Sequence, residues 1–550
     1  MTNADAIAPN AQRLLWAGFT AILAAGVGFG VRGGLFDTWA ADFNFNGTQL
    51  ANISLGAGFI SFCFGIIIGG VIVDKIGYGK LVLAAFALHV LSAFITFAAK
   101  PGMSTDQAYQ LLYWGTFAFG LANGTLEAVA NPLVATLFPK NRNHYLNILH
   151  ASWPLGMVFG GMIGWFLGGA FKWSWQAQLA LYLLPTIAYG VMFFGQKFPK
   201  SEASSKGLKL GEMFKDVGIL GALVVSTMLY FFLRRDVFIP MFDGNVVTGS
   251  VISGLIAAGF LVWVAAITKG SIGHPILFFL FIIHAMIGSV ELGTDGWIQN
   301  ITGTILTPTQ GKILFVFTSL MMFLLRFCAH AIETKLGLKP VGLLFVCSVL
   351  ACLGLNLVSA VSTFGPALGA LLVYAFGKTF FWPTMLAVAS DRFPRTGAIA
   401  ISLMGGIGML SVGLLGGPGL GYARDRFSSE ELAKSDPALY EEWKSTGAKS
   451  SYFGMREVTP IDPARLGDAK KAAVAKKLVD AGNKEPETVA LAATLTPEQQ
   501  KVVEADILGN RKTLKVDSFI PAVMAICFLF LLIYFKSIGG YRPLTVEESK

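Results

Sequence analysis

Three polar residues inside one long apolar run have the types and spacing that could move a proton. Asn123, Glu127 and Asn131 are four residues apart, so on a helix they share one face. Pro132 follows directly and would loosen the backbone beside them. Because burial favours the neutral form of a carboxyl group and a nearby cation favours the charged form, Glu127 is a candidate proton carrier. The alternative is a structural hydrogen-bond cluster between helices.

Other ionisable and aromatic residues also lie inside apolar runs. Asp37, late in the first run, is the second candidate for proton coupling, and Arg32 and Arg326 are candidate charge partners. Aromatic faces can stack on the C–H surfaces of a sugar, although helix packing explains a single tryptophan equally well. The candidates for contact with a solute are Asn123, Asn131, His150, Trp153, Glu291, Asp295, Trp297, Lys378 and Trp382.

No motif for a cofactor, a metal or an enzymatic reaction accompanies these residues. The five cysteines all lie in apolar runs, and the spacing of His89, His284 and His330 does not suit a metal. The sequence contains neither a nucleophile elbow nor a phosphate-binding loop. We therefore expect no cofactor, no metal and no enzymatic activity.

Membrane-spanning helices are the elements that must position the candidate residues. The chain has 550 residues, of which 54% are hydrophobic and only 14% charged, whereas soluble proteins carry about 25% charged residues. A bilayer core requires a helix of about 20 apolar residues. The sequence predicts fourteen such spans: 14–41, 51–73, 81–99, 110–138, 146–170, 176–196, 217–233, 250–267, 275–299, 311–333, 340–361, 365–389, 396–421 and 518–536.

Basic residues in the short loops predict how the spans are oriented. The net charge is +9, and the basic residues lie mostly between the apolar runs and in one late insert, so we expect a lipid bilayer as the partner and not nucleic acid. Arg234 and Arg235 are the exception to a one-sided distribution. With an even number of spans, both termini should be cytoplasmic, in a multi-pass protein of the inner membrane. The basic loop residues on one side are Lys75, Lys80, Lys140, Arg142, Lys335, Lys339, Arg392, Arg395 and the cluster from Lys197 to Lys215.

An internal repeat divides the chain into two halves. A Gly-x6-Asp-x-Trp motif occurs twice, 258 positions apart, and two further motifs recur in the same order at offsets of 251 to 259. Such self-similarity is typical of transporters built from repeats. It predicts two pseudo-symmetric halves of six helices, with 217–233 and 250–267 as an inserted hairpin. The matched segments are 30–39 with 288–297, 74–80 with 333–339, and 132–139 with 383–394.

The repeat and the polar stretches together predict five regions. The late insert should lie outside the cytoplasm and hold two or three short helices, because Asp462-Pro463 and Thr496-Pro497 are typical helix starts. Gly482 and Gly509 are the matching stops. A disordered linker is the alternative, but the insert is rich in alanine, leucine and valine. The regions are a six-helix half (1–200), a cytoplasmic linker and hairpin (201–270), five helices of the second half (271–423), the insert (424–516), and a last helix with a cytoplasmic tail (517–550).

One loop resembles the cytoplasmic loop signature of the major facilitator superfamily. It reads Gly70-x3-Asp74-Lys75-x-Gly77-x2-Lys80, in which the glycines permit a tight turn. The resemblance implies an all-α polytopic fold of two six-helix halves, here with an added hairpin. It also implies that these five residues act as a conformational gate between the halves.

A narrower resemblance covers the fourth and fifth spans. Residues 123–133 and 146–156 are similar to the fucose–galactose–glucose proton symporter branch, whose fourth span carries a Glu-x3-Asn-Pro motif. The resemblance implies that Asp37 and Glu127 handle sugar and protons, and that His150 replaces a glutamine that contacts the sugar. The chain departs from that branch at Arg32, Glu291 and Asp295, in the extra hairpin and in the late insert.

The sequence therefore predicts a monomeric secondary transporter that moves a small, sugar-like solute together with protons by alternating access. A proton-driven drug antiporter is the alternative, but its usual Gly-Pro-rich fifth span is replaced here by Trp153-Pro154-Leu-Gly156. Oligopeptide symporters carry a Glu-x2-Glu-Arg motif in span one, which is absent. A non-transporting sensor, with the insert as its signalling part, is a further alternative, and a membrane-embedded enzyme is the least supported.

Overall fold

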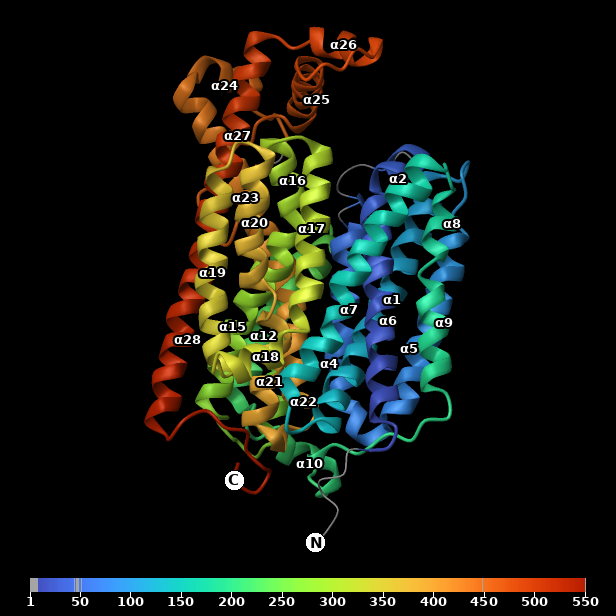
Figure 1. Ribbon diagram of the computed structural model, residues 1–550, viewed down its shortest axis with the longest axis vertical. Coiled ribbons are helices and arrows are strands. Elements are labelled where there is room, and N and C mark those ends of the chain that lie inside the picture. The colour runs from blue at the N-terminus through green and yellow to red at the C-terminus, as the bar shows by residue number, and fades with distance from the viewer. Residues whose placement is uncertain (1–7, 44, 46–48, 51, 448, 550) are drawn as a thin grey trace.

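The computed structural model describes residues 8–43, 45, 49–50, 52–447 and 449–549, and this part of the chain is almost entirely helical (Figure 1). Two isolated β-bridges, Lys444 with Ile461 and Ser450 with Val458, are its extended pairings. The helices form two bundles side by side, with a smaller helical cap above the second bundle. Helix α1 begins, and the tail after α28 ends, at the face opposite the cap, which we call the termini face.

The first half consists of long apolar helices packed through glycines. Helices α1 and α7 each carry a Gly-x3-Gly pair, Gly26 with Gly30 and Gly156 with Gly160, which lets their backbones touch. A Cβ atom on Gly156 would lie 2.7 Å from the Gly26 Cα, so a larger residue would separate the helices. The elements are α1 (Ala11–Gly34), α2 (Phe36–Phe43), η1 (Asn52–Ile60), α4 (Ser61–Ile76), α5 (Tyr78–Phe97), α6 (Thr105–Leu137), α7 (Arg142–Met162), η2 (Ile163–Ala170), α8 (Trp175–Ala180) and α9 (Leu183–Phe193).

A linker and a helical hairpin connect the halves. The linker contains two short helices, and the hairpin packs its first helix against α15 and α22 of the second half. The second helix of the hairpin, α14, is mostly exposed at the outside of the bundle. The elements are α10 (Glu202–Ser205), α11 (Leu210–Met213), α12 (Gly218–Phe232), η3 (Leu233–Phe238), α13 (Ile239–Met241) and α14 (Val246–Ile267).

The second half repeats the arrangement of the first. Two of its spans contain a π-helical segment, η4 and η6, a wider turn that often occurs at functional sites. Helices α23 and α27 continue beyond the bundle into the cap. The elements are α15 (Pro275–Gly288), η4 (Ser289–Thr294), α16 (Asp295–Ile305), α17 (Pro308–Arg326), α18 (Ala329–Lys335), α19 (Pro340–Ala360), α20 (Phe364–Lys378), α21 (Phe381–Arg392), η5 (Pro394–Thr396), α22 (Ile399–Ser411), η6 (Val412–Gly416), α23 (Gly417–Ser435), α27 (Pro497–Asp517) and α28 (Phe519–Ser537).

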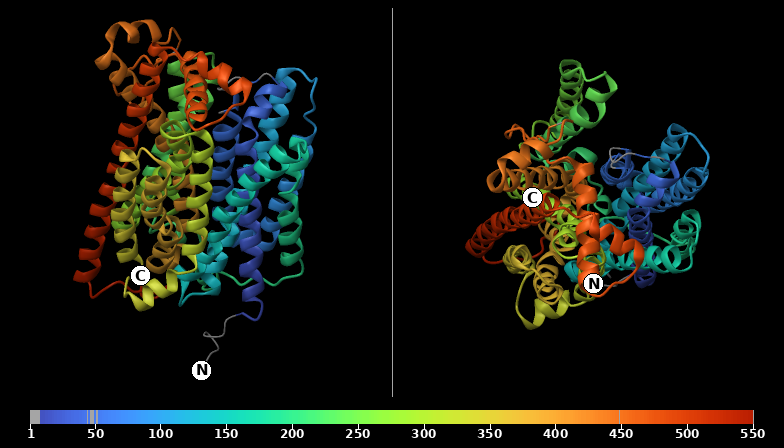
Figure 2. Two further views of the ribbon diagram at one scale, coloured as in Figure 1. Left: turned by 45° about the horizontal axis from the view of Figure 1, so that its top comes forward. Right: turned by 90° about the horizontal axis from the view of Figure 1, so that it is seen from above.

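The cap is built from residues 424–516 and has a small core of its own. Helices α24 (Pro437–Trp443), α25 (Pro463–Asp480) and α26 (Pro486–Ala493) join the outer ends of α23 and α27 over the second half (Figure 2). Leu432, Trp443 and Val502 are among its buried apolar residues. This packing explains why the insert is folded and is not a flexible linker.

The ends of the cap helices confirm three of the four expected signals. Asp462 and Thr496 cap α25 and α27 with their side chains, and Gly482 follows α25 with a positive φ of 97°. The predicted stop at Gly509 is wrong, because α27 continues through it to Asp517. A Cβ atom at position 509 would lie 2.4 Å from the Ser428 nitrogen, so this glycine serves the crossing of α27 and α23.

A buried carboxylate joins three elements of the cap. The Asp506 side chain is only 1% exposed; it lies 3.7 Å from the Arg424 Nε, forms an ion pair with Lys470, and accepts a hydrogen bond of 3.0 Å from the Ser428 Oγ. Burial lowers the pKa of the Lys470 ammonium, and the Asp506 carboxylate opposes that shift. These contacts hold α23, α25 and α27 together.

Replacing Asp506 with alanine is expected to loosen the cap by about 3 kcal/mol, because two cations lose their buried partner. Limited trypsin digestion of the purified protein should then cut the cap at least ten times faster. Asp468→Ala is the matched control, since the Asp468 side chain is 75% exposed in the same cap. Equal digestion of the two variants would contradict the structural role of Asp506.

The number of spans stays partly a prediction. Within the described residues, twelve helices are long and apolar enough to cross a membrane. The two expected spans that are not among them correspond to α6 and α12. Helix α12 has only 15 residues, and α6 carries polar residues along much of its length.

Candidate functional site

Ionisable side chains gather where the two halves meet, a contact that we call the seam. On one side of the seam α7 packs against α17 and α21, and on the other side α4 packs against α22. Because a charge inside a membrane bundle is costly unless it has a partner, the contacts of these side chains show how each charge at the seam is satisfied.

The first half contributes a carboxyl group held by an amide and an imidazole. Asn131 lies one turn after Glu127 on α6 and donates a hydrogen bond of 3.3 Å from its Nδ2 to the Glu127 Oε2. The Asn131 Oδ1 lies 2.8 Å from the His150 Nε2 of α7, so the imidazole donates there. All three residues are buried. The predicted proton carrier therefore belongs to a hydrogen-bonded chain that reaches the seam.

The second half contributes an arginine that bridges the seam. The Arg326 Nη2 donates to the Glu291 Oε1 over 2.8 Å, and its Nε donates to the Thr379 carbonyl over 2.9 Å. Its Nη1 donates to the His150 carbonyl in the other half. The Glu291 Oε2 accepts from the Trp382 backbone N–H over 3.0 Å. Arg326 thus links both halves around one buried carboxylate.

A second ion pair lies beside the first. Lys378 is fully buried and binds both carboxylate oxygens of Asp295, whose side chain is 17% exposed. Asp295 begins α16 directly after the π-helical segment η4, which also carries Glu291. The π-helical turn changes the rotation of the backbone by about one residue, so carboxylates four positions apart face separate cations.

The charges of this cluster do not balance. Glu291 and Asp295 each have a cation at ion-pair distance, whereas Glu127 has none within 4 Å among the residues that the structure describes. Burying an unpaired carboxylate is costly, and a group so placed takes up a proton or binds a cation instead. The arrangement can therefore bind one positive charge reversibly.

Buried polar atoms without a partner lie close to the ion pairs. In the described part of the chain, the Trp382 Nε1 and both ring nitrogens of His284 have no hydrogen-bond partner. The two rings lie 4.7 Å apart between centroids. Because unsatisfied buried polar groups destabilise a fold, they indicate a place where water or a polar solute binds. The sequence indicates only packing or local hydrogen bonding for His284, since its spacing to other histidines carries no further signal.

Some predicted site residues lie outside this cluster. Asn123 accepts from the His89 Nε2 over 2.7 Å, and His89 contacts the Tyr189 hydroxyl at 2.9 Å, inside the first half. Arg32 lies over the Phe119 ring at 3.9 Å and has no carboxylate at ion-pair distance among the described residues. Asp37 belongs to α2, and its side chain is outside the described part of the structure.

The three candidate tryptophans occupy different environments. Trp382 is buried beside the ion pairs, and Trp153 of α7 packs against Phe29 at 5.3 Å between ring centroids. Trp297 lies near the cap, with the Arg424 guanidinium 5.9 Å from its ring. Only Trp382 therefore shares the central cluster, while the other two pack against neighbouring elements.

The predicted gate residues lie at the termini face of the seam between α4 and α22. The Asp74 Oδ1 accepts from the Ser201 hydroxyl over 2.7 Å, and Gly77 has a positive φ of 89°. Gly70 touches α22, because a Cβ atom added to it would lie 2.1 Å from the Ser402 Cβ. Lys75 and Lys80 are exposed.

Alanine at position 70 is expected to force α4 away from α22 and lower the stability by about 1–3 kcal/mol. Thermal unfolding in detergent measures the change. Gly369→Ala is the control, because nothing lies within 4 Å of its added methyl group. The pair Gly70→Ala with Ser402→Gly should recover the loss; a Gly70→Ala variant as stable as the control would show that the contact is not tight.

A second bridge across the seam had no sequence signal beyond its charges. Arg142 of α7 donates to the Asp391 Oδ1 of α21 over 3.1 Å, and the Tyr541 hydroxyl donates to the Asp391 Oδ2 over 2.8 Å. The tail after α28 thus reaches a contact between the halves. From the sequence, Arg142 is only an orienting loop charge, because its partner is 249 positions away.

These features define a class of protein: a two-half helical membrane bundle with buried charges at the seam between its halves. A profile of the Major Facilitator Superfamily matches residues 18–417. The chain belongs to the Major Facilitator Superfamily, and the family assignment made from the sequence is confirmed. It is a multi-pass membrane protein of a transporter family.

Solved structures share the fold at low sequence identity. The proton:xylose symporter XylE, bound to 6-bromo-6-deoxy-D-glucose, aligns with a TM-score of 0.57 and 11% identity, over 99% of each chain. The transporter FucP in its outward conformation gives 0.52 and 14%, over 75% of this chain and 92% of FucP. The human organic anion transporter MFSD10 gives 0.52 and 12%, over 95% of this chain and all of MFSD10. No curated protein sequence matches the chain.

Proposed function

We propose that the protein is a secondary active transporter that carries a small polar solute, with a sugar as the favoured class, in symport with protons. It works by alternating access about the seam and not as an enzyme. The observation that carries the proposal is the unbalanced cluster at the seam, where Glu127 is buried without a cation while two neighbouring carboxylates are each paired. Glu127 is the proposed proton site.

The proposed solute site lies beside the proton site. His150, Asn131 and Lys378 supply polar groups there, and Trp382 offers an aromatic ring with a free indole N–H. Hydroxyl groups of a sugar match such a mixture of donors, acceptors and a ring face. The resemblance of residues 123–156 to a sugar symporter branch supports the same class, and XylE and FucP share the fold.

Alternating access would couple the movement of the proton to the movement of the solute. When the Glu127 carboxylate is charged, its hydrogen bond to Asn131 and the field of Arg326 hold it at the seam. When the carboxyl group is protonated, burying it away from water costs less free energy. The proton therefore favours the enclosed state through which the solute passes. We further propose that the termini face is cytoplasmic, since the basic loop residues gather there, and that the membrane is the inner one.

Uptake of labelled sugars into proteoliposomes, with and without an inward proton gradient, tests the proposal. Gradient-stimulated accumulation of one sugar is the expected result. Accumulation that needs no gradient would contradict proton coupling, and gradient-driven export of organic cations without sugar uptake would support an antiporter instead. Proteoliposomes that move no solute of either class would favour the sensor alternative.

A further inference from the structure

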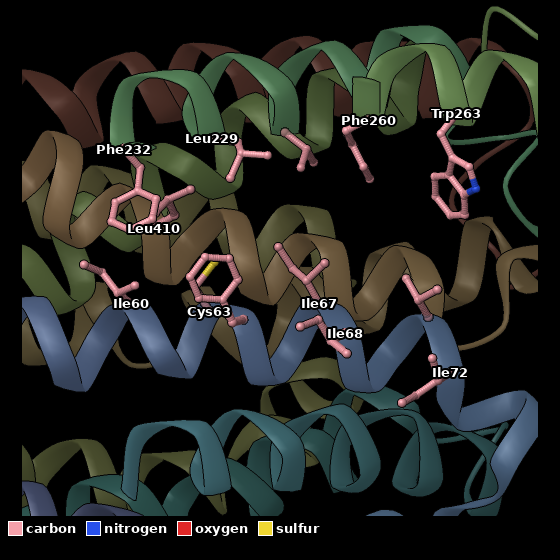
Figure 3. A pocket seen from close by; sticks show the side chains of 13 residues that line it. Ile60, Cys63, Ile67, Ile68, Ile72, Leu229, Phe232, Phe260, Trp263 and Leu410 are labelled. Carbon is pink, nitrogen blue, oxygen red and sulfur yellow. The ribbon is translucent and has the colours of Figure 1, made fainter. Parts of the chain in front are cut away.

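An apolar crevice lies between the inserted hairpin and the seam, away from the charged cluster. Its walls come from α4, α12, α14 and α22, and its volume is about 350 Å³ (Figure 3). All of its lining residues are apolar or cysteine, and Ile67, Leu229 and Phe260 are typical. A water-soluble ligand would find no hydrogen-bond partner in it, so its occupant must be a hydrocarbon.

The crevice is closed at one end and open toward the bilayer. Phe64 of α4 and Phe232 of α12 meet edge to face, with ring centroids 6.0 Å apart, at the end nearer the cap. Ile68 and Trp263 flank the open side and are 53% and 38% exposed. Trp263 and Ile72 lie at the same end of the crevice in Figure 3, and α4 and α14 continue from there to their last residues, Ile76 and Ile267, at the termini face. A chain entering from the membrane would therefore lie with its tail at Phe232.

The length of the crevice fits one leaflet of a bilayer. It extends from Ile60, the last residue of η1, to Ile72 of α4, which is about 18 Å at 1.5 Å per residue. One leaflet is half of a hydrocarbon core about 30 Å thick, or about 15 Å. Ile60 to Ile72 lie in the middle of the span Ala57–Ile76, so an acyl chain that enters from the termini face would extend past the middle of the bilayer core to fill the crevice.

Three lysines lie around the end where a headgroup would lie. Lys75 follows Ile72 and Ile68 on the same face of α4, Lys215 adjoins Phe214, whose ring packs on Trp263, and Lys269 follows α14. All three lysines are exposed, and none has an ion-pair partner among the described residues. Three acidic groups also lie near this end: Asp74 is bound to Ser201, Glu212 caps α11, and Asp216 is partly buried.

We propose that the crevice is a site for one acyl chain of an anionic phospholipid, whose headgroup lies among Lys75, Lys215 and Lys269. The lipid fills the space between α4, which belongs to the first half, and the hairpin, which packs on the second half. Apolar contacts along the acyl chain and electrostatic contacts with the headgroup together make the site selective for an anionic phospholipid.

Native mass spectrometry of the full chain, titrated with palmitoyl-oleoyl phosphatidylglycerol or phosphatidylcholine, tests this site. One phosphatidylglycerol should bind at least ten times more tightly than phosphatidylcholine. Ile68→Trp fills the crevice and should remove that binding, whereas Leu83→Trp, at a 67% exposed position of α5, should keep it. The combined change Lys75→Gln, Lys215→Gln and Lys269→Gln should abolish the preference for the anionic lipid.

Three results would overturn the proposal. They are equal binding of both lipids, unchanged binding by Ile68→Trp, and tighter binding of free oleate than of phosphatidylglycerol. Melting temperatures of all variants, measured in the same detergent, separate a lost site from a misfolded protein. If Ile68→Trp does not fold, Cys63→Phe fills the crevice from another position of α4 and is tested in the same way.

Discussion

Proton-driven accumulation of solute is expected to disappear when Glu127 is replaced by glutamine, while exchange of solute across the membrane continues. Glutamine keeps the size of the side chain and can still bond to Asn131, but it cannot release a proton. In proteoliposomes, uphill uptake should fall at least a hundredfold, and counterflow without a gradient should stay within about threefold of the unaltered protein.

A carboxylate far from the seam provides the control for this change. Asp468→Asn alters an exposed residue of the cap and should leave both uptake and counterflow unchanged. Full uphill accumulation by Glu127→Gln would show that another group carries the proton. In that case Asp37, the second candidate, would be the next residue to neutralise.

Replacing Arg326 with methionine is expected to have the largest effect on stability. The change leaves Glu291 buried without a cation and removes donors from the carbonyl groups of His150 and Thr379. Breaking a buried ion pair from one side costs about 3–5 kcal/mol. The melting temperature in detergent should fall by several degrees, and transport should be lost.

A double variant distinguishes the cost of the unpaired charge from the role of the bridge. Arg326→Met with Glu291→Gln removes both charges, so most of the stability should return. Transport should not return, because the arginine also joins the halves through the His150 carbonyl. An Arg326→Met variant that melts like the unaltered protein would mean that Arg326 is not a buried partner of Glu291.

The architecture could be predicted because its signals are long and repeated. Apolar runs of membrane length and three motifs at nearly one offset indicated two halves of helices, which membership of the superfamily confirms. The π-helical segments, such as η4, had no such signal, since a single extra residue per turn leaves the apolar pattern almost unchanged. The number of spans stays a prediction for α6 and α12, because α6 carries many polar residues and α12 is short.

The site could be predicted by residue type but not by pairing. Arg326 was a candidate partner for Glu127 or Asp37, yet it binds Glu291 of η4, because the packing of the helices and not their order along the chain decides which charges meet. Asn123 was placed on one face with Glu127 and Asn131. Each step of four residues rotates about 40° around a helix, so Asn123 is about 80° from Asn131 and faces His89 instead.

The cap provides a position from which rotation of the second half can be measured. Helix α27 is 21 residues long and runs without a break from α28 into the cap, which makes it an arm of about 31 Å. Each ten degrees of tilt at its base moves its tip by about 5 Å. A fluorophore on α26, paired with one on the first half, would convert a rotation of a few degrees into a readable change in energy transfer.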